Sequence, residues 1–174
     1  MRTDYLDDGD LEIVLALLTP PNRLACQLAI HTGLRIGDVL GIRTDALQQR
    51  MSIVEAKTGK KNRIYVPSAL LSRLRGQAGS IWVFPGRCDE TRHRTRQAVW
   101  ADIKRAQRAI RLPANVGPHT MRKVYAVRQY RRSGNLTAVQ RALQHSDQAV
   151  TMLYAMADHL TAQRMAEGTK RRSK

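Results

Sequence analysis

Four residues in the last third of the chain could together perform chemistry on a phosphate ester. His119 and Arg122 are three residues apart, so their side chains project from one face if the segment is helical. His145 follows, and Tyr154 comes nine residues later. An arginine can grip a phosphate, a histidine can accept a proton and a tyrosine can attack as a phenolate. This set predicts a site that binds a phosphate and attacks it with a phenol.

Two further cations precede this group. Arg35 lies in the first turn of a short helix expected within residues 32–40, where free backbone amides also favour an anion. Asp38, three residues on, can pair with Arg35 and fix its direction. Lys57 is expected at the end of the first strand of a hairpin, which would hold its amine out like a finger. The simpler alternatives are a surface Arg–Asp pair and a solvated lysine turn.

Cleavage of a phosphodiester requires charge stabilisation at the non-bridging oxygens. Many enzymes use Mg²⁺ held by clustered carboxylates, and the 14 acidic residues show no such cluster. Arg35, Arg122 and one histidine can do this work as fixed donors, so no metal and no other cofactor is expected. A phosphotyrosine conserves the energy of the ester. Rejoining therefore needs no ATP, which suits breaking and resealing DNA rather than degrading it.

The charge of the chain points to the same partner. Its 174 residues fit one domain and carry 30 Lys+Arg against 14 Asp+Glu, a formal net charge of +16. Such an excess favours double-stranded DNA, the alternative being a merely soluble basic surface. Apart from the residues above, we expect DNA contacts from Lys60, Lys61, Arg63, Arg92, Arg94, Arg96 and Lys104.

Other compartments and partners are disfavoured by the sequence. The N-terminus is charged where a signal peptide needs an apolar core, which favours the cytoplasm. We find neither a long apolar run nor a basic amphipathic helix with aromatic anchors, so no membrane partner is expected, and no small-molecule substrate. Cys26 and Cys88 belong to no CxxC or Cys/His cluster and are expected to be buried reduced thiols.

Hydrophobic periodicity predicts a mainly helical α+β domain with one small antiparallel sheet. Asp10 is expected to cap the first helix, and Pro20-Pro21 to end it. Residues 81–85 are either a strand or a packed turn, and residues 86–96 a basic loop. The remaining elements are helices over 9–18, from 22 to near Gly33, 69–78, 99–110, 118–134 and 137–143, a further helix after Ser146, and a hairpin over 51–67.

The motifs resemble the catalytic domain of the tyrosine recombinases, the phage integrase family. Thr-Gly-Leu-Arg-Ile at 32–36 is similar to the first-arginine box, with Asp38 as its usual acidic neighbour. Lys57-Thr-Gly-Lys resembles the hairpin lysine, and His119-Thr-Met-Arg122 the His-x-x-Arg box. Leu-Gln-His-Ser at 143–146 resembles the Leu-Gly-His-Ser box, with Gln144 in place of the glycine. Tyr154 stands at the distance expected of the nucleophile.

The resemblance implies roles for these residues. Arg35, Arg122 and His145 would bind the oxygens of the scissile phosphate, and Tyr154 would form a 3′-phosphotyrosine. Lys57 would protonate the 5′-oxygen. His119 would act as a base or positioning group. Tyr125 competes weakly as the nucleophile, but it matches a core aromatic residue of the His-x-x-Arg helix.

The resemblance also implies an organisation and an activity. Residues 1–167 would form the catalytic domain and residues 168–174 a basic flexible tail, with no separate DNA-clamping domain evident before Arg35. The activity would be site-specific recombination, with self-association on paired DNA sites, in which residues 155–167 would pack on a neighbouring protomer. Alternatives are relaxation of supercoiled DNA, as by a type IB topoisomerase, and a DNA-binding accessory protein that retains the fold.

Overall fold

The computed structural model describes residues 3–143. Its helices and strands confirm the expected mainly helical α+β class with one small antiparallel sheet. His145, Tyr154, the helices expected after Ser146 and the basic tail all lie outside the described residues. The elements are α1 (Asp8–Leu17), α2 (Pro20–Thr32), α3 (Ile36–Leu40), β1 (Arg50–Val54), β2 (Lys61–Tyr65), α4 (Ser68–Gln77), α5 (Arg96–Ala109), α6 (Pro118–Ser133) and α7 (Leu136–Leu143).

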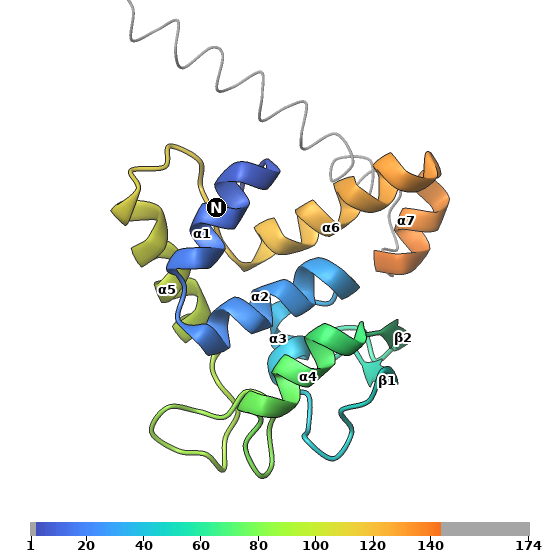
Figure 1. Cartoon of the computed structure of the whole chain (residues 1–174). Helices are drawn as coiled ribbons and strands as arrows, with labels where there is room; N and C mark the ends of the chain where they lie inside the picture. Colours follow the sequence, from blue (N-terminus) through green and yellow to red (C-terminus); the bar gives the residue numbers. More distant parts are fainter. Residues whose placement is uncertain (1–2, 144–174) are drawn as a thin grey trace, which may run out of the picture.

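Helix α2 forms the centre of the domain. Figure 1 shows it between α6 on one side and α4 on the other, with α1 and α5 at one end and the hairpin and α7 at the opposite end. Leu28 of α2 and Val124 of α6 are both buried in the main hydrophobic core. Burial of apolar surface along α2 and α6 therefore fixes both helices. His119 lies in the first turn of α6, and Arg35 follows the glycine that ends α2.

Glycines end two helices where the sequence places them. Gly33 follows α2 with φ 73° and Gly134 follows α6 with φ 60°, both in the left-handed region that favours glycine. The start of α1 differs from expectation. Asp7 caps this helix by accepting the Asp10 amide at 2.8 Å, because the helix begins at Asp8 and leaves Asp10 inside its first turn.

Two other expected boundaries also shift. Pro20 begins α2 instead of ending the preceding helix, because proline is well suited to the first turn of a helix. Arg96 begins α5, capped by the Thr95 hydroxyl, which accepts the Ala98 amide at 3.1 Å. The basic loop is therefore one residue shorter than expected.

The hairpin pairs β1 and β2 antiparallel, with Met51 opposite Ile64 and Val54 opposite Lys61. Met51 and Ile64 are buried and anchor one face of the hairpin in the core. The expected place of Lys57 is corrected, since β1 ends at Val54 and Lys57 falls in the turn that follows. The Glu55 amide donates to the Lys60 carbonyl at 3.0 Å and closes this turn.

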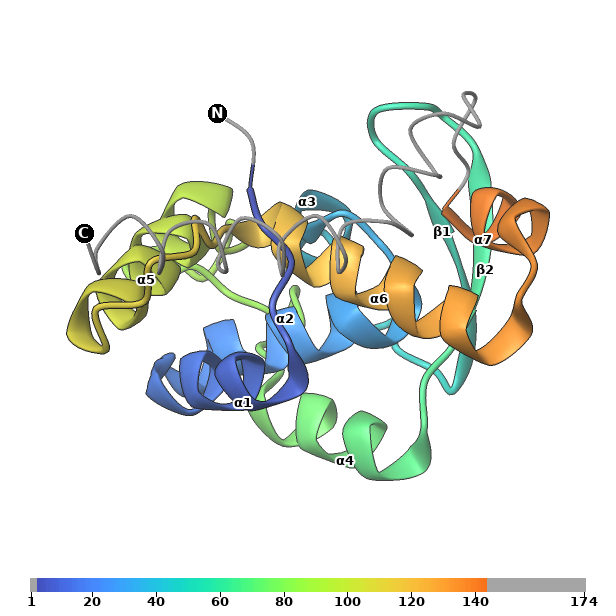
Figure 2. The same cartoon turned by 90° about the horizontal axis from the view of Figure 1, so that it is seen from above.

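The segment before α1 fastens the start of α6. The Asp4 amide donates to the Asn115 carbonyl at 2.8 Å, and the Asn115 amide donates back to Asp4 Oδ2 at 2.8 Å. The Thr120 hydroxyl also donates to the Asp4 carbonyl at 2.9 Å. Figure 2 shows this segment passing over the helices on its way to α1. These contacts fix the turn that carries His119.

Residues 81–95 form a packed loop with isolated bridges rather than a strand. Arg43 bridges Trp82, and Pro85 bridges His93. The Trp82 indole donates to the Thr91 carbonyl at 2.9 Å, and its ring meets that of His93 edge-on at a centroid distance of 5.3 Å.

Cys26 is buried as expected, whereas Cys88, in the loop over residues 81–95, is exposed, which corrects that expectation. None of the helices among residues 3–143 combines the length and the apolar character needed to cross a bilayer.

Candidate active site

A cleft of about 840 Å³ opens where the starts of α3, α5 and α6 meet the hairpin turn. Four of the six expected catalytic residues line it. The other two, His145 and Tyr154, lie outside the described residues. Its lining comprises Arg35, Ile36, Gly37, Asp38, Ala56, Lys57, His93, Thr95, Arg96, Gln97, Trp100, Pro118, His119 and Arg122.

Arg35 is the N-cap of α3 and has extended dihedral angles, φ −66° and ψ 144°. Its guanidinium forms an ion pair with Glu55, while Asp38 accepts the Ala56 amide at 2.9 Å. The prediction that Arg35 pairs with Asp38 is therefore wrong. Side chains three apart meet when both residues are helical, and the extended Arg35 does not meet that condition.

Glu55 is the site residue that the sequence interpretation missed. Its side chain is fully buried, whereas that of Arg35 is 22% exposed. The Thr58 hydroxyl also donates to the Glu55 carboxylate at 3.2 Å. A possible signal was present in the sequence, because Glu55 continues the alternation of the strand on the side of the apolar Ile53. A carboxylate on that side requires a buried cationic partner.

Arg122 is buried, with 2% of its surface exposed. Its two terminal nitrogens donate to the carbonyls of Gly33 and Leu143. The first carbonyl ends α2 two residues before Arg35, and the second ends α7. Arg122 therefore ties the ends of α2 and α7 to α6, while its side chain borders the cleft.

His119 projects from the first turn of α6 and is exposed at the cleft. Partial burial lowers the pKa of its imidazole below the usual value, and nearby cations lower it further. These cations are, in decreasing order of effect, Arg122, Arg35, Lys123 and Lys57. His119 is therefore mainly neutral at pH 7 and available as a proton acceptor.

The rest of the cleft rim combines cations with an aromatic ring. Lys57 is exposed in its turn, and within residues 3–143 its amine has neither a hydrogen bond nor an ion pair. Arg96 packs over Gly37, where an added Cβ would lie 3.2 Å from its Cδ atom. Trp100, one turn after Arg96, is 50% exposed and was also missed, although its spacing from Arg96 placed it on the same helix face.

The other expected DNA contacts are more scattered. Lys60, Lys61 and Arg63 are exposed on the hairpin, but they do not line the cleft. Arg92 is exposed and pairs with Asp89 at 3.4 Å. Burial lowers the pKa of Arg94. Lys104 donates to Gln107 Oε1 at 2.9 Å and Asn115 Oδ1 at 2.7 Å, which holds its amine away from the cleft lining.

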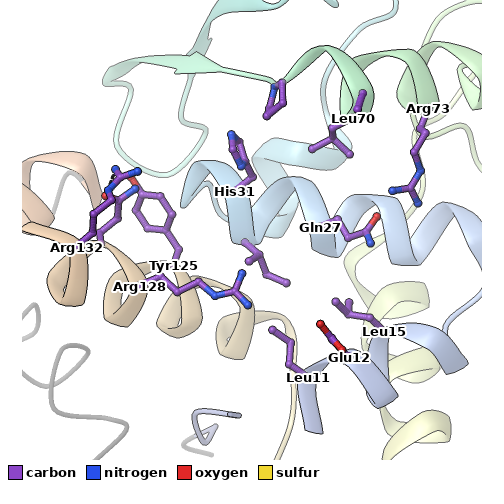
Figure 3. Close-up of a pocket in the computed structure, with 14 residues that line it drawn as sticks. Leu11, Glu12, Leu15, Gln27, His31, Leu70, Arg73, Tyr125, Arg128 and Arg132 are labelled. Carbon is purple, nitrogen blue, oxygen red and sulfur yellow. Dashed lines mark hydrogen bonds between the residues drawn. The ribbon is translucent and has the colours of Figure 1, made fainter. Parts of the chain in front are cut away.

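Tyr125 lies in a second cavity, not among the residues of the cleft. This cavity of about 610 Å³ lies between α1, α2, α4 and α6, and Figure 3 shows the Tyr125 ring there beside His31 and Arg132. Burial raises the pKa of the Tyr125 phenol, although the charges of Arg132 and Arg122 oppose this. The phenolate needed for attack is thus disfavoured at Tyr125.

Comparison with known proteins links this chain to a family. The sequence model of the phage integrase family matches residues 9–160. Tyrosine recombinase XerD of Lacticaseibacillus casei is 29% identical over 160 residues, which is 83% of this chain and 52% of that protein. The integrase of Escherichia phage P2 is 24% identical over 155 residues, which is 88% of this chain and 43% of that protein. The chain thus spans about half the length of these relatives.

Solved structures show the same fold. A lambda integrase dimer bound to a COC′ core site aligns with a TM-score of 0.76 and 19% identity, over 89% of this chain and 60% of that one. The catalytic domain of bacteriophage HP1 integrase aligns with a TM-score of 0.63 and 19% identity, over 90% of this chain and 89% of that one. Since the family model matches residues 9–160, most of the length of the chain, the chain belongs to the phage integrase family.

Proposed function

We propose that this chain is the catalytic part of a site-specific DNA recombinase, which cleaves and rejoins DNA through a covalent 3′-phosphotyrosine. The observation that carries the proposal is the cleft. Arg35, Lys57 and the His119–Arg122 pair come from three separate parts of the sequence and line one concave surface. A charge of +16 over the whole chain supports DNA as the partner.

The residues divide the reaction between them. Arg35 and Arg122 neutralise the non-bridging oxygens of the scissile phosphate, so the proposal needs neither a metal nor ATP. The Tyr154 oxygen attacks phosphorus, and the bond from phosphorus to the 5′-oxygen breaks. Lys57 gives a proton to that oxygen, and neutral His119 is suited to accept one. Attack by a 5′-hydroxyl on the phosphotyrosine then reverses the step and joins a strand.

Tyr154 is preferred to Tyr125 as the nucleophile. Tyr125 lies in the second cavity with its phenol pKa raised by burial. A tyrosine needs its phenolate, and the ordinary phenol pKa of about 10 already makes that form scarce at neutral pH. The charges of Arg35 and Arg122 would stabilise the phenolate of a tyrosine placed close to both.

The decisive experiment traps the covalent intermediate. A nicked substrate that loses the freed 5′ fragment is incubated with the protein and examined by denaturing electrophoresis. The parent and Tyr125→Phe should become attached to the DNA. Tyr154→Phe should bind DNA as well as the parent and form no adduct. A cross-linked Tyr154→Phe protein would show that the nucleophile is wrong, and an unreactive parent would contradict the proposed activity.

We also propose that the protein assembles on paired DNA sites in the cytoplasm of a bacterial or phage-infected cell. The lambda integrase structure that this fold resembles is described as a dimer on a core site, which supports the first part. Exchange of strands between two labelled duplexes distinguishes recombination from relaxation of supercoiled DNA. Relaxation without exchange would favour a type IB topoisomerase activity instead.

A further inference from the structure

Glu55 is a buried acid in the exposed turn that carries Lys57. Its side chain has no solvent-exposed surface, whereas residues 56–60 of the same turn are all exposed. Burying an ionised carboxylate is costly unless a cation and hydrogen bonds compensate for the lost water. Arg35 supplies the cation and the Thr58 hydroxyl a hydrogen bond. An isolated surface turn has no need of such an arrangement.

The contacts of Glu55 dock the turn on α3. Within residues 3–143 the turn is hydrogen-bonded to this region at two points, Arg35 to the Glu55 carboxylate and the Ala56 amide to Asp38. The Gly59 amide donates to the Glu55 carbonyl at 2.8 Å and shapes the turn from within. Lys57 follows directly after the docked pair. The position of its amine therefore depends on the contact between Glu55 and Arg35.

The burial of Glu55 also limits what it can do. A side chain without exposed surface cannot touch DNA from its place beneath the turn. Arg35, by contrast, is held by its backbone as the N-cap of α3 and keeps 22% of its side chain exposed. The exposed turn that carries Glu55 has fewer other contacts to hold it in place than Arg35 has. The Arg35–Glu55 contact thus holds the turn more than it holds the arginine.

We propose that Glu55 is a positioning residue. It holds the turn that carries Lys57 against Arg35 and thereby orients the Lys57 amine, the general acid. This inference rests on the proposed function. Removal of the Glu55 carboxylate should leave phosphate binding by Arg35 largely intact and let the turn that carries Lys57 move. A displacement of about 1 Å at a reacting group can cost about 100-fold in rate. Glu55 would therefore act on the chemical step and not on DNA binding.

Substitution of one leaving atom separates this role from others. The 5′-oxygen leaves as an alkoxide, a strong base and therefore a poor leaving group, so it needs the proton of Lys57. A 5′-bridging sulfur leaves as a thiolate, whose conjugate acid has a pKa of about 8.5, and needs no proton. Cleavage of the sulfur substrate should then be indifferent to where Lys57 points.

The experiment measures single-turnover adduct formation on matched nicked duplexes with oxygen or sulfur at the scissile position. Glu55→Ala should be slower than the parent by about 100-fold on oxygen, and within about five-fold of the parent on sulfur. Lys57→Ala should show the same pattern. Arg35→Ala should be slow on both substrates, because the non-bridging oxygens still need its charge.

Two controls keep the result specific. Glu12→Ala makes the same change of charge at an exposed residue of α1 that borders the second cavity, and it should match the parent on both substrates. Glu55→Gln keeps an acceptor for Arg35 with a weaker, uncharged hydrogen bond. It should lose about five-fold on oxygen and regain it on sulfur. If Glu55→Ala does not fold, as judged by its DNA binding, this milder variant provides the test.

Three outcomes would overturn the inference. They are parental cleavage of the oxygen substrate by Glu55→Ala, an equal defect of that variant on both substrates, and an unfolded Glu55→Ala together with a fully active Glu55→Gln. Each would reduce Glu55 to a structural partner of Arg35. Failure of the proposed function would look different, because the parent would then form no adduct with either substrate.

Discussion

Arg122 donates a hydrogen bond to the carbonyl of Gly33, although the two residues are 89 positions apart in the sequence. Gly33 ends α2 in the left-handed region and stands two residues before Arg35. The ring of Tyr125, three residues after Arg122, covers the place where a Cβ of Gly33 would be. Arg35 and Arg122 are thus linked through one glycine, which leaves little freedom in their relative position.

Replacement of Gly33 tests this link. In Gly33→Ala the new Cβ would lie 2.5 Å from Cε1 of Tyr125, and φ would remain at 73°. The matched control is Gly134→Ala, since Gly134 has φ 60° but nothing within 4 Å of an added Cβ. We expect about 1–2 kcal/mol of lost unfolding free energy for the control, and about 1–3 kcal/mol more for Gly33→Ala. Urea unfolding measures both, and equal losses would show that the contact with Tyr125 is unimportant.

Replacement by lysine should affect Arg35 and Arg122 differently. In Arg122→Lys one amine replaces the two separate guanidinium nitrogens that reach the Gly33 and Leu143 carbonyls, so the free energy of unfolding should fall by about 2–4 kcal/mol. Arg35→Lys keeps a cation that can pair with Glu55 and should cost less than about 1 kcal/mol. Both should lose cleavage activity, because neither lysine can bind phosphate bidentately. Similar stability of the two variants in urea would contradict the conclusion that the bonds of Arg122 to the two carbonyls stabilise the fold.

How far the sequence predicts this site can be judged from its residues. Local signals succeeded, since glycine at the ends of α2 and α6 and the spacing of His119 and Arg122 depend on neighbours in the chain. The pairing of Arg35 with Glu55, 20 residues away, depends on how the hairpin packs on α3. No propensity or periodicity encodes that packing. For the same reason the wrong acid, Asp38, was preferred.

The same argument applies to Arg122 and Tyr125. The motif predicts Arg122 as a phosphate ligand, whereas its bonds to two backbone carbonyls are visible only in the fold. Tyr125 is on the same helix as Arg122, but the packing of α6 on α2 turns its ring into the second cavity (Figure 3). A buried position between helices is set by tertiary contacts, which a single sequence does not specify.

The pKa of His119 offers a measurement independent of activity. Burial and the cations around it lower this pKa, so the midpoint of its NMR titration should lie below about 6.5, and the ring should stay neutral at pH 7. Salt at about 1 M shortens the screening length to about 3 Å and should raise the midpoint part of the way, because only the effect of charge is screened. A midpoint at or above the ordinary value in dilute buffer would contradict this description. Lys57→Ala should raise it slightly, as Lys57 is the last of the contributing cations.

DNA binding should depend steeply on salt. The logarithm of the affinity should fall with the logarithm of the salt concentration with a slope of about 4.5 to 7, as for on the order of five to eight phosphate contacts. Arg96 lines the cleft from the start of α5, so Arg96→Ala should lower the slope by about 0.9. Arg75 is exposed on α4, which contributes no residue to the cleft, and Arg75→Ala should leave the slope unchanged. Equal effects of the two variants in a fluorescence anisotropy titration would mean that DNA is held by the net charge of the chain and not by the cleft.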